Sequence, residues 1–298
     1  MRERYIVIVN PAAGRGRCGR FAAAALDKLC AAGLDAEVQE TRGPGEGITL
    51  ARMAYAKGFR NFIAVGGDGT SFEVVNGLFP AAASEGRATL GFLPLGTGNS
   101  FLRDFTTRGA DYAIESILER RRRPCDVLRL NHAGGSLYFI NTLNVGFAAD
   151  VAVLTNRRLK RLGELGYLVG VLMCLARLRR RPFPLCADSE RDARRCLFLA
   201  FSNSKYTGGK MMIAPNASID SGKIEYVHWG PIGRFGLLRN LSRLFDGSHI
   251  RHPLASRRAA ARIEFKIGEP VDVVVDGEVL TLEVQSIEVL PSALDVMV

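Results

Sequence analysis

The sequence lacks most of the patterns that would mark a zinc protein, a secreted protein or a membrane-spanning protein. Its six cysteines include no Cys-x-x-Cys pair, and none of its four histidines stands at zinc-ligand spacing from them, so we expect reduced thiols. The longest apolar run, near 167–178, is shorter than the roughly 20 apolar residues that a spanning helix needs. The N-terminal residues lack the apolar stretch of a signal peptide. We therefore expect a cytoplasmic protein, in contact with a membrane at most peripherally.

Two common nucleotide-binding patterns are also missing. The chain has no Gly-x-x-x-x-Gly-Lys-Ser/Thr sequence, which excludes a P-loop enzyme. Gly14, Gly16 and Gly19 have the spacing of a dinucleotide fingerprint, but they begin several residues after the first predicted strand. A dinucleotide site is therefore not favoured at these glycines.

The chain does have an excess of positive charge, with 40 Lys and Arg against 30 Asp and Glu in 298 residues. This balance favours an anionic partner, such as a nucleotide, an acidic membrane or a nucleic acid. We do not expect a nucleic acid, because no basic motif interleaved with aromatic residues supports one. Hydrophobic residues make up 47% of the chain, which is enough for a folded core.

The first half of the chain alternates short apolar runs with helical segments. Repeated strand–turn–helix units predict a parallel sheet with helices on its faces. Ligands of such sheets bind at the carboxyl ends of the strands. The predicted strands are 5–9, 36–41, 61–65 and 89–93, and the predicted helices are 21–32, 48–57, one that ends at Leu78, and 111–120.

The pattern changes after the run Arg120–Pro124. Strand-like segments then dominate, several with the alternation of a half-buried strand. We expect an α/β domain over 1–124 and an antiparallel β-sandwich over 125–290, with residues 291–298 packing back on the first domain. The predicted strands of the second domain are 126–130, 137–145, 196–202, 224–229, 261–267, 271–275, 279–284 and 286–290, with helical inserts near 160–178 and 231–246.

Three glycine-rich turns each follow a predicted strand of the first domain: Asn10–Gly16, Gly66–Thr70 and Pro94–Asn99. Parallel strands end at one edge, so the three turns should converge on one crevice. Glycine lets backbone N–H groups approach an anion without a Cβ clash, and the following helix N-terminus adds partial positive charge. We therefore predict a phosphate-binding site, the alternative being that these glycines only form tight turns.

Asp68 is the only acidic residue inside one of these turns. A carboxylate beside phosphates would be repelled unless a cation lay between them. Mg²⁺ bridging Asp68 and the β- and γ-phosphates removes that conflict. The alternative is an aspartate that caps the next helix.

These motifs resemble the diacylglycerol kinase catalytic-domain family, which includes sphingosine kinases and bacterial lipid kinases. The resemblance rests on Asn10-Pro11 with its downstream glycines, on Gly66–Gly77 (GGDGTSFEVVNG) and on Leu95–Asn99 (LGTGN). It continues in the second half, at Tyr206–Ala217, Asp220-Ser-Gly222 and Asp276-Gly-Glu278, and so covers nearly the whole chain in order.

The resemblance implies a two-domain, NAD kinase-like fold and an ATP- and Mg²⁺-dependent kinase that phosphorylates a lipid hydroxyl, of the diacylglycerol or sphingoid type. It implies that Glu278 accepts the hydroxyl proton. From the charge argument above, we expect Asp68 to hold the catalytic Mg²⁺. Together with the turns, the resemblance predicts a nucleotide site made of Asn10, Thr41, Gly66, Gly67, Asp68, Gly69, Thr70, Glu73, Gly96, Thr97, Gly98 and Asn99.

The segment around Glu278 also has a simpler interpretation. Asp276-Gly277 lies between two β runs, and Asp-Gly favours an ordinary hairpin turn. Such a turn would present its carboxylates at a domain edge, where a base could face the γ-phosphate.

The chain departs from the family pattern at two places. Phe72 stands where the family usually has Asn, which puts nucleotide contacts there in question. The family's structural Mg²⁺ uses an Asp directly before Gly, but this chain has Ser221 there and Asp220 one position earlier. Either Asp220 takes over, with Ser221 beside it, or that metal site is weak or absent.

The run 159–181 is apolar in its middle and basic at both ends. It could rest on an anionic membrane, or it could be a core helix of the second domain. Two rival functions remain: an NAD kinase-like enzyme, since that group shares Gly-Gly-Asp-Gly-Thr, and a non-catalytic regulator that binds a nucleotide or lipid. A homodimer is compatible with the sequence.

Overall fold

The structure is a computed structural model that describes residues 3–155 and 163–298. In the second segment it describes side chains from residue 169 onward. Part of the basic and apolar run, 159–162, therefore lies outside the described residues. The first domain contains β1 (Arg4–Val9), α1 (Arg17–Ala31), β2 (Asp35–Glu40), α2 (Glu46–Ala56), β3 (Asn61–Gly66), α3 (Asp68–Leu78), α4 (Ala81–Ser84), β4 (Ala88–Pro94), η1 (Leu102–Asp104) and α5 (Ala110–Leu118).

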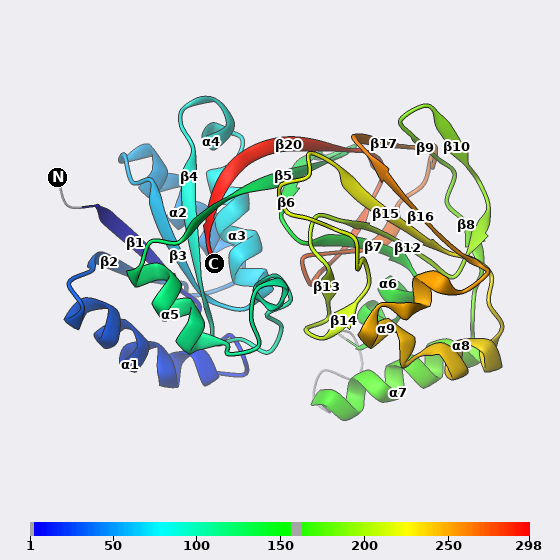
Figure 1. The fold of residues 1–298 in the computed structure, drawn as a ribbon, viewed down its shortest axis with the longest axis horizontal. Helices are drawn as coiled ribbons and strands as arrows, with labels where there is room; N and C mark the ends of the chain where they lie inside the picture. Colours follow the sequence, from blue (N-terminus) through cyan, green and yellow to red (C-terminus); the bar gives the residue numbers. More distant parts are fainter. Residues whose placement is uncertain (1–2, 156–162) are drawn as a thin grey trace.

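Its sheet is parallel, in the order β4-β3-β1-β2, with helices on both faces (Figure 1). Strands β1, β3 and β4 are buried over nearly their whole length, which is why their sequences read as continuous apolar runs. Strand β2, at the edge, is partly exposed. The predicted α/β architecture is confirmed.

The second domain is mainly antiparallel, as predicted. Its helices are α6 (Phe147–Leu154), α7 (Gly163–Ala176), α8 (Arg234–Asn240), α9 (Arg243–Asp246) and η4 (Ser248–Arg251). Its strands are β5 (Arg122–His132), β6 (Gly135–Phe139), β7 (Thr142–Gly146), β8 (Arg181–Pro182), β9 (Leu185–Ala187), β10 (Glu190–Asp192), β11 (Arg195–Cys196), β12 (Phe198–Ser202), β13 (Tyr206–Thr207), β14 (Met211–Met212), β15 (Ile224–Trp229), β16 (Ala255–Ala260), β17 (Arg262–Phe265), β18 (Val271–Val275), β19 (Glu278–Leu282) and β20 (Val284–Met297).

Two layers of strands enclose the core of this domain. One is the six-stranded sheet β16-β15-β12-β7-β18-β19, and the other is formed by β10, β9, β17, β20, β5 and β6. Side chains such as Leu130 and Ile287 from one layer and Phe201 and Val275 from the other form one buried cluster. The opposite face of the six-stranded sheet, with Trp229, is covered by α6 to α9.

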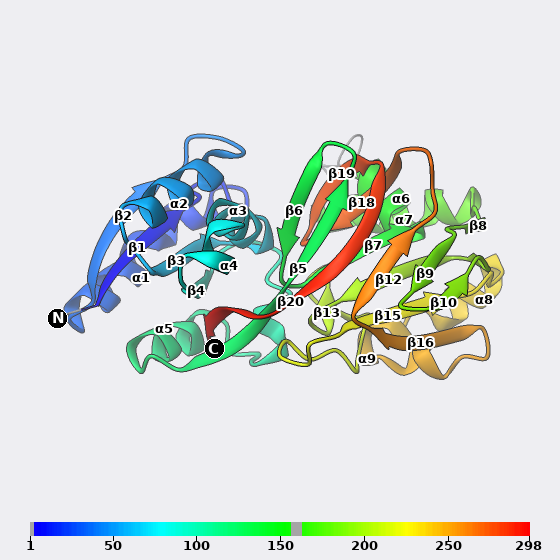
Figure 2. The same cartoon turned by 90° about the horizontal axis from the view of Figure 1, so that it is seen from above.

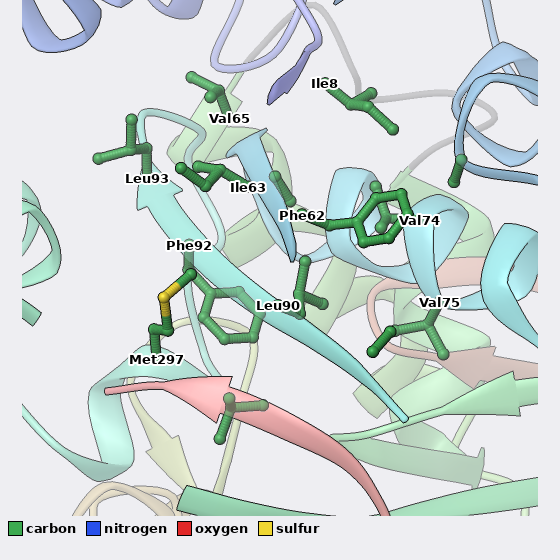
Figure 3. Packing of buried hydrophobic residues seen from close by; sticks show 14 of the residues in the cluster. Ile8, Phe62, Ile63, Val65, Val74, Val75, Leu90, Phe92, Leu93 and Met297 are labelled. Carbon is green, nitrogen blue, oxygen red and sulfur yellow. The ribbon is translucent and has the colours of Figure 1, made fainter. Parts of the chain in front are cut away.

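Strand β20 joins the two domains. It pairs antiparallel with β5 along most of its length, and its last residues, Leu294–Met297, pair parallel with Ala88–Gly91 of β4. Figures 1 and 2 show it passing from the second domain into the first, and Figure 3 shows Met297 beside Phe92 in the first core. The sheet of the first domain and one layer of the second are thus one continuous sheet.

Two predicted strands differ from the structure in extent, and some elements were not predicted. The single strand 137–145 is two strands, β6 and β7, that belong to different sheets, with the chain turning at Ile140-Asn141. The strand 286–290 is part of the much longer β20, because a register shift between Leu290 and Leu294 lets it continue into the other domain. Helix α6 and the strands β8, β9, β10, β13, β14 and β16 were not predicted.

Candidate active site

A pocket of about 510 Å³ lies between the two domains. From the first domain it is lined by the turns after all four parallel strands, and from the second by three separate segments. The predicted site residues that line it are Asn10, Thr41, Gly67, Asp68, Gly69, Thr70, Glu73, Gly96, Thr97, Gly98 and Glu278. The convergence of the glycine turns follows from the parallel strand order.

The turns after β3 and β4 touch through their backbones. A Cβ on Gly96 would lie 2.6 Å from the Gly67 Cα atom, and one on Gly67 would lie 2.8 Å from the Gly98 carbonyl oxygen. The Asp68 amide donates to that same oxygen at 2.9 Å. Glycine is required here because no side chain fits between the two turns. The resulting surface is mostly peptide groups beside the N-terminus of α3, a setting that attracts anions.

Asp68 is held by the second of these turns. Its carboxylate accepts hydrogen bonds from the backbone N–H groups of Ser100, at 2.9 Å, and Phe101, at 3.4 Å. Burial raises the pKa of Asp68, and these N–H groups oppose the rise. The carboxylate therefore binds the turns together while it also lines the pocket.

Two predicted nucleotide residues do not line this pocket. The Asn99 side chain donates to the Gly96 carbonyl oxygen at 3.1 Å and so closes the turn after β4. Gly66 leaves room for the Thr70 side chain, which a Cβ there would overlap. Thr70 is in turn contacted by the Asn10 amide, at 3.4 Å. The structure thus gives Gly66 and Asn99 supporting positions.

Glu73 supports the loop that follows β2. Its carboxylate accepts the N–H groups of Gly45, at 2.8 Å, and Gly47, at 2.9 Å, at the start of α2. These bonds satisfy helix N-terminal donors and hold 41–44 beside the pocket. Arg42, Gly43 and Pro44 of this loop were not predicted, because no motif marks them.

Glu278 enters from the second domain on a tight hairpin. Val275 pairs with Glu278 across the hairpin, leaving Asp276 and Gly277 as a two-residue turn with φ values of 47° and 89°. Positive φ at both central residues is typical of the turn that Asp-Gly favours. Both interpretations of this segment are therefore compatible: it is a hairpin, and it brings Glu278 to the pocket. A Cβ on Gly69 would overlap the Glu278 Oε1 atom, so the two domains meet closely here.

Asp276 anchors this hairpin from within. Its buried carboxylate accepts three backbone N–H groups, from Ile140 at 3.0 Å, Asn141 at 3.1 Å and Thr142 at 2.9 Å. Burial raises the pKa of Asp276 to about 7, against the effect of the N–H groups, and the nearby Asp68 charge raises it further. Asn141 also lines the pocket. In the sequence, the only feature that marks Asn141 is that it is a polar residue within the mostly apolar run 137–145.

The seam between the domains continues at the β13–β14 hairpin. The Gly209 N–H donates to the Ser100 hydroxyl oxygen at 2.8 Å, and the Lys205 N–H donates to the Asp104 carboxylate at 3.0 Å. Thr207 and Gly208 line the pocket. They belong to the motif that carried the family resemblance, but no site role was predicted for them.

Phe72 corrects an expectation from the sequence. It is not among the residues that line the pocket, and it is buried in the core of the second domain with Leu128 and Phe139. Nearby, the Asn76 amide donates to the Tyr138 carbonyl oxygen at 2.8 Å. The aromatic residue therefore fastens α3 to the second domain and does not replace a nucleotide contact.

The residues predicted for a structural metal do not form a suitable donor set. Asp220 pairs with Arg123 at 3.7 Å and accepts the Ser218 hydroxyl at 2.6 Å, while the Ser221 hydroxyl oxygen accepts the Lys223 N–H. The buried carboxylate nearby is Asp126, which accepts the backbone N–H groups of Gly222, at 2.6 Å, and Ser292, at 2.7 Å. Among the described residues, no group of three or more His, Cys, Asp and Glu could hold a metal.

A catalytic Mg²⁺ needs fewer protein ligands than a structural metal ion does. Magnesium usually takes one or two carboxylates and completes its shell with water and substrate phosphates. Asp68 supplies one carboxylate at the edge of the glycine turns. The donor set therefore fits a magnesium ion that arrives with a phosphate substrate.

Comparison with known proteins finds relatives that match both domains. The model of the diacylglycerol kinase catalytic domain matches residues 4–130, and that of the YegS C-terminal NAD kinase beta sandwich-like domain matches residues 141–298. A Bacillus subtilis protein named diacylglycerol kinase is 28% identical over 93% of this chain and 90% of its own length. A Chromohalobacter salexigens protein named "Probable lipid kinase YegS-like" is 37% identical over 74% of this chain and 70% of its own.

A crystal structure of a Bacillus anthracis str. Sterne protein assigned as a diacylglycerol kinase superposes with a TM-score of 0.79 at 25% identity, covering 99% of this chain and 95% of that one. Within the described part of this chain, no helix is both long enough and apolar enough to cross a membrane. The two domain models together span both domains and the pocket between them. The chain therefore belongs to the diacylglycerol kinase catalytic-domain family, a family of lipid kinases.

Proposed function

We propose that this protein transfers the γ-phosphate of ATP to the hydroxyl group of a lipid, of the diacylglycerol or sphingoid type. The observation that carries the proposal is the meeting of two unlike walls in one pocket: glycine turns from one domain and the Glu278 carboxylate from the other. The names of the relatives above, diacylglycerol kinase and lipid kinase, support this choice of acceptor.

The first wall would bind the nucleotide. The glycine turns Gly67–Thr70 and Gly96–Gly98, at the N-terminus of α3, suit the phosphates. The N–H groups of Asp68, Thr70 and Gly96 already donate to carbonyl oxygens of these turns, so they shape the site and are not the phosphate donors. Thr41 and the loop that Glu73 holds complete the wall on the β2 side. Mg²⁺, held by Asp68, would neutralise phosphate charge when bound.

Glu278 would act as the general base. In the reaction, the lipid hydroxyl oxygen forms a bond to the γ-phosphorus, the bond from that phosphorus to the β,γ-bridging oxygen breaks, and ADP leaves. The hydroxyl proton passes to the Glu278 carboxylate. Asp276 would keep Glu278 in place by anchoring the hairpin.

The proposal also concerns the surface on which the enzyme meets its acceptor. A lipid acceptor resides in a membrane, so we include peripheral contact with a membrane surface. We also include a homodimer in the proposal.

The test is an assay with labelled ATP, Mg²⁺ and a total lipid extract, with NAD as a second acceptor. We expect labelled lipid and no labelled NAD. The variant Glu278→Gln should lower kcat by about 10²–10³-fold and leave ATP binding nearly unchanged, because only the base is lost. Label in NAD would favour the NAD kinase-like alternative. ATP binding without transfer to either acceptor, and no effect of Glu278→Gln, would indicate a regulator instead.

A further inference from the structure

Helix α7 carries apolar side chains on both of its faces. Val171 and Leu175 point into the core under the six-stranded sheet. Val169, Leu172 and Met173, at positions i, i+3 and i+4 of the opposite face, are exposed. A surface helix normally has a polar outer face. The outer stripe of α7 therefore lacks the polarity expected of a helix that stays in water.

Helices α8 and α9 continue this surface. Phe235 is 88% exposed, and Leu238 and Phe245 are also exposed. Arg234 joins α8 to α7, because its guanidinium donates to the carbonyl oxygens of Leu175 and Ala176. Figure 1 shows α7, α8 and α9 along one edge of the second domain. We call Val169, Leu172, Met173, Phe235, Leu238 and Phe245 the α7–α9 face.

This concentration is unusual for the molecule. Eleven large apolar side chains of the described residues are exposed, and six of them belong to the α7–α9 face. Scattered exposed apolar residues need no explanation, but a group of them on adjoining helices marks an interaction surface. The α7–α9 face is therefore a candidate interaction surface.

Basic residues accompany the apolar ones. Arg177, directly after the end of α7, follows Met173 by four positions, and Arg239 follows Phe235 by four positions on α8. Arg243 begins α9, and all three arginines are exposed. Helix α8 has two arginines and no acidic residue. Apolar side chains with an arginine border match the interface of an anionic bilayer, whose phosphates lie just outside its acyl chains.

The same charges disfavour a second copy of the chain as the partner. A two-fold interface uses the same patch on both subunits, so it would bring the arginines of one copy against those of the other. The chain also carries a net charge of +10, which adds to that repulsion. An anionic lipid surface has the opposite sign and avoids this cost.

The α7–α9 face is connected to the pocket by one short hairpin. Directly after α9, a Cβ on Gly247 would lie 2.9 Å from the Met212 sulfur atom of β14. The other end of the β13–β14 hairpin supplies Thr207 and Gly208 to the pocket wall. A lipid surface in contact with the α7–α9 face would thus lie beside the element that borders the pocket.

We propose that the α7–α9 face docks on an anionic lipid bilayer, with its apolar side chains in the interface and its arginines against the lipid phosphates. Docking itself does not depend on catalysis. The claim that docking brings the acceptor lipid to Glu278 rests on the proposed function. The two can therefore fail separately.

The experiment compares two double variants of the full chain. Leu172→Glu with Phe235→Glu places charge on the α7–α9 face. Phe21→Glu with Met53→Glu does the same on α1 and α2 of the first domain, where both side chains are 52% exposed. Binding is measured by co-sedimentation with vesicles of phosphatidylcholine and phosphatidylglycerol. We expect the first pair to weaken binding by about tenfold or more and the second by less than about twofold, with thermal unfolding unchanged in both.

Activity separates docking from chemistry. Against acceptor lipid in vesicles, the α7–α9 variant should lose activity in parallel with binding, and against a short-chain acceptor dissolved in water it should equal the wild type. Wild-type protein that does not bind the vesicles, or an α7–α9 variant that binds as well as the control, overturns the proposal. So does a wild-type dimer that only the α7–α9 variant dissociates, with no change in vesicle binding. Binding lost as expected, with no lipid phosphorylated by the wild type, would leave docking standing and remove the kinase proposal.

Discussion

The two walls of the pocket are built in different ways. The wall from the first domain is mostly backbone, in which turns such as Gly67 and Gly96 approach too closely for any side chain between them. The wall from the second domain depends on side chains, with Glu278 at the pocket and the buried Asp276 behind it. The backbone wall comes from short local turns after parallel strands. The Asp276 carboxylate, in contrast, bonds to backbone 136 positions away in the sequence.

This difference suggests how each wall responds to change. Peptide groups cannot be removed by substitution, so the backbone wall changes only where added bulk moves it. The side-chain wall can lose one carboxylate and with it the position of a whole hairpin. The predictions below test that contrast, beginning with the largest effect.

Replacing Asp276 should damage the side-chain wall most. Asp276→Asn leaves three buried N–H groups with one amide oxygen, so we expect about 1–3 kcal/mol lower free energy of unfolding. Because Glu278 is carried by the same hairpin, kcat should fall by about 10²-fold. Urea unfolding and steady-state kinetics measure the two effects. Full activity in a destabilised variant would show that the hairpin does not position Glu278.

A side chain added at Gly69, where the two walls meet, should lower activity. Gly69→Ala would overlap the Glu278 Oε1 atom, so we expect kcat to fall by about tenfold. The helix itself should not suffer, because Ala is the better helix former by about 1 kcal/mol. Gly268→Ala is the control, since no atom lies within 4 Å of its added Cβ. Equal kinetics for the two variants would mean that the domains do not close on Gly69 during the reaction.

Glu73 is a place where a side chain supports the backbone wall. Glu73→Gln keeps one acceptor for the Gly45 and Gly47 N–H groups and removes the charge at the start of α2. We expect the KM for ATP to rise by about threefold with little change in kcat, because the loop 41–44 loosens. The exposed Glu85→Gln should behave as wild type. A change in kcat alone would argue that Glu73 acts on the chemistry.

The smallest effect on activity is expected at the seam beside the pocket, where Asp104 accepts the Lys205 N–H and only stability should change. Burial raises the pKa of Asp104 to about 6, against the lowering effect of the Lys205 charge and N–H. The folded state therefore holds this proton more tightly than the unfolded state, and the stabilisation from it is lost as pH rises from about 4 to 6.

Asp104→Asn removes this titration. The unfolding free energy of the variant, relative to wild type, should rise across the same pH range, by at most about 3 kcal/mol. Urea unfolding at several pH values from about 4 to 7 measures the difference. A difference that does not change with pH would show that Asp104 is not responsible.

Much of the first domain could be read from the sequence. Continuous apolar runs mark buried parallel strands, and a glycine turn after such a strand predicts both the start of the next helix and a phosphate cradle. Helix α3 begins at Asp68, inside the turn that the sequence marks. Strand β20 shows the limit of this method. The sequence indicated a strand at 286–290 and the packing of 291–298 on the first domain, but it did not indicate that one continuous strand makes both contacts.

The position of Phe72 shows why side-chain surroundings were harder to predict. Its place in the motif, two residues after Thr70, suggested a nucleotide contact. Two residues of α-helix rotate the side chain by about 200°, and Phe72 instead enters the second domain's core. The strands that form it, with Leu128 and Phe139, come more than fifty positions later in the chain.

By itself, then, the sequence determined the local elements: the parallel strands, the three glycine turns and the Asp276-Gly277 hairpin, each of which depends on backbone conformations of a few adjacent residues. Only the tertiary structure decided that Glu278 lies against Gly69 and that α7 to α9 share one exposed apolar face. Contacts between distant segments depend on how whole sheets pack, and no local pattern contains that information.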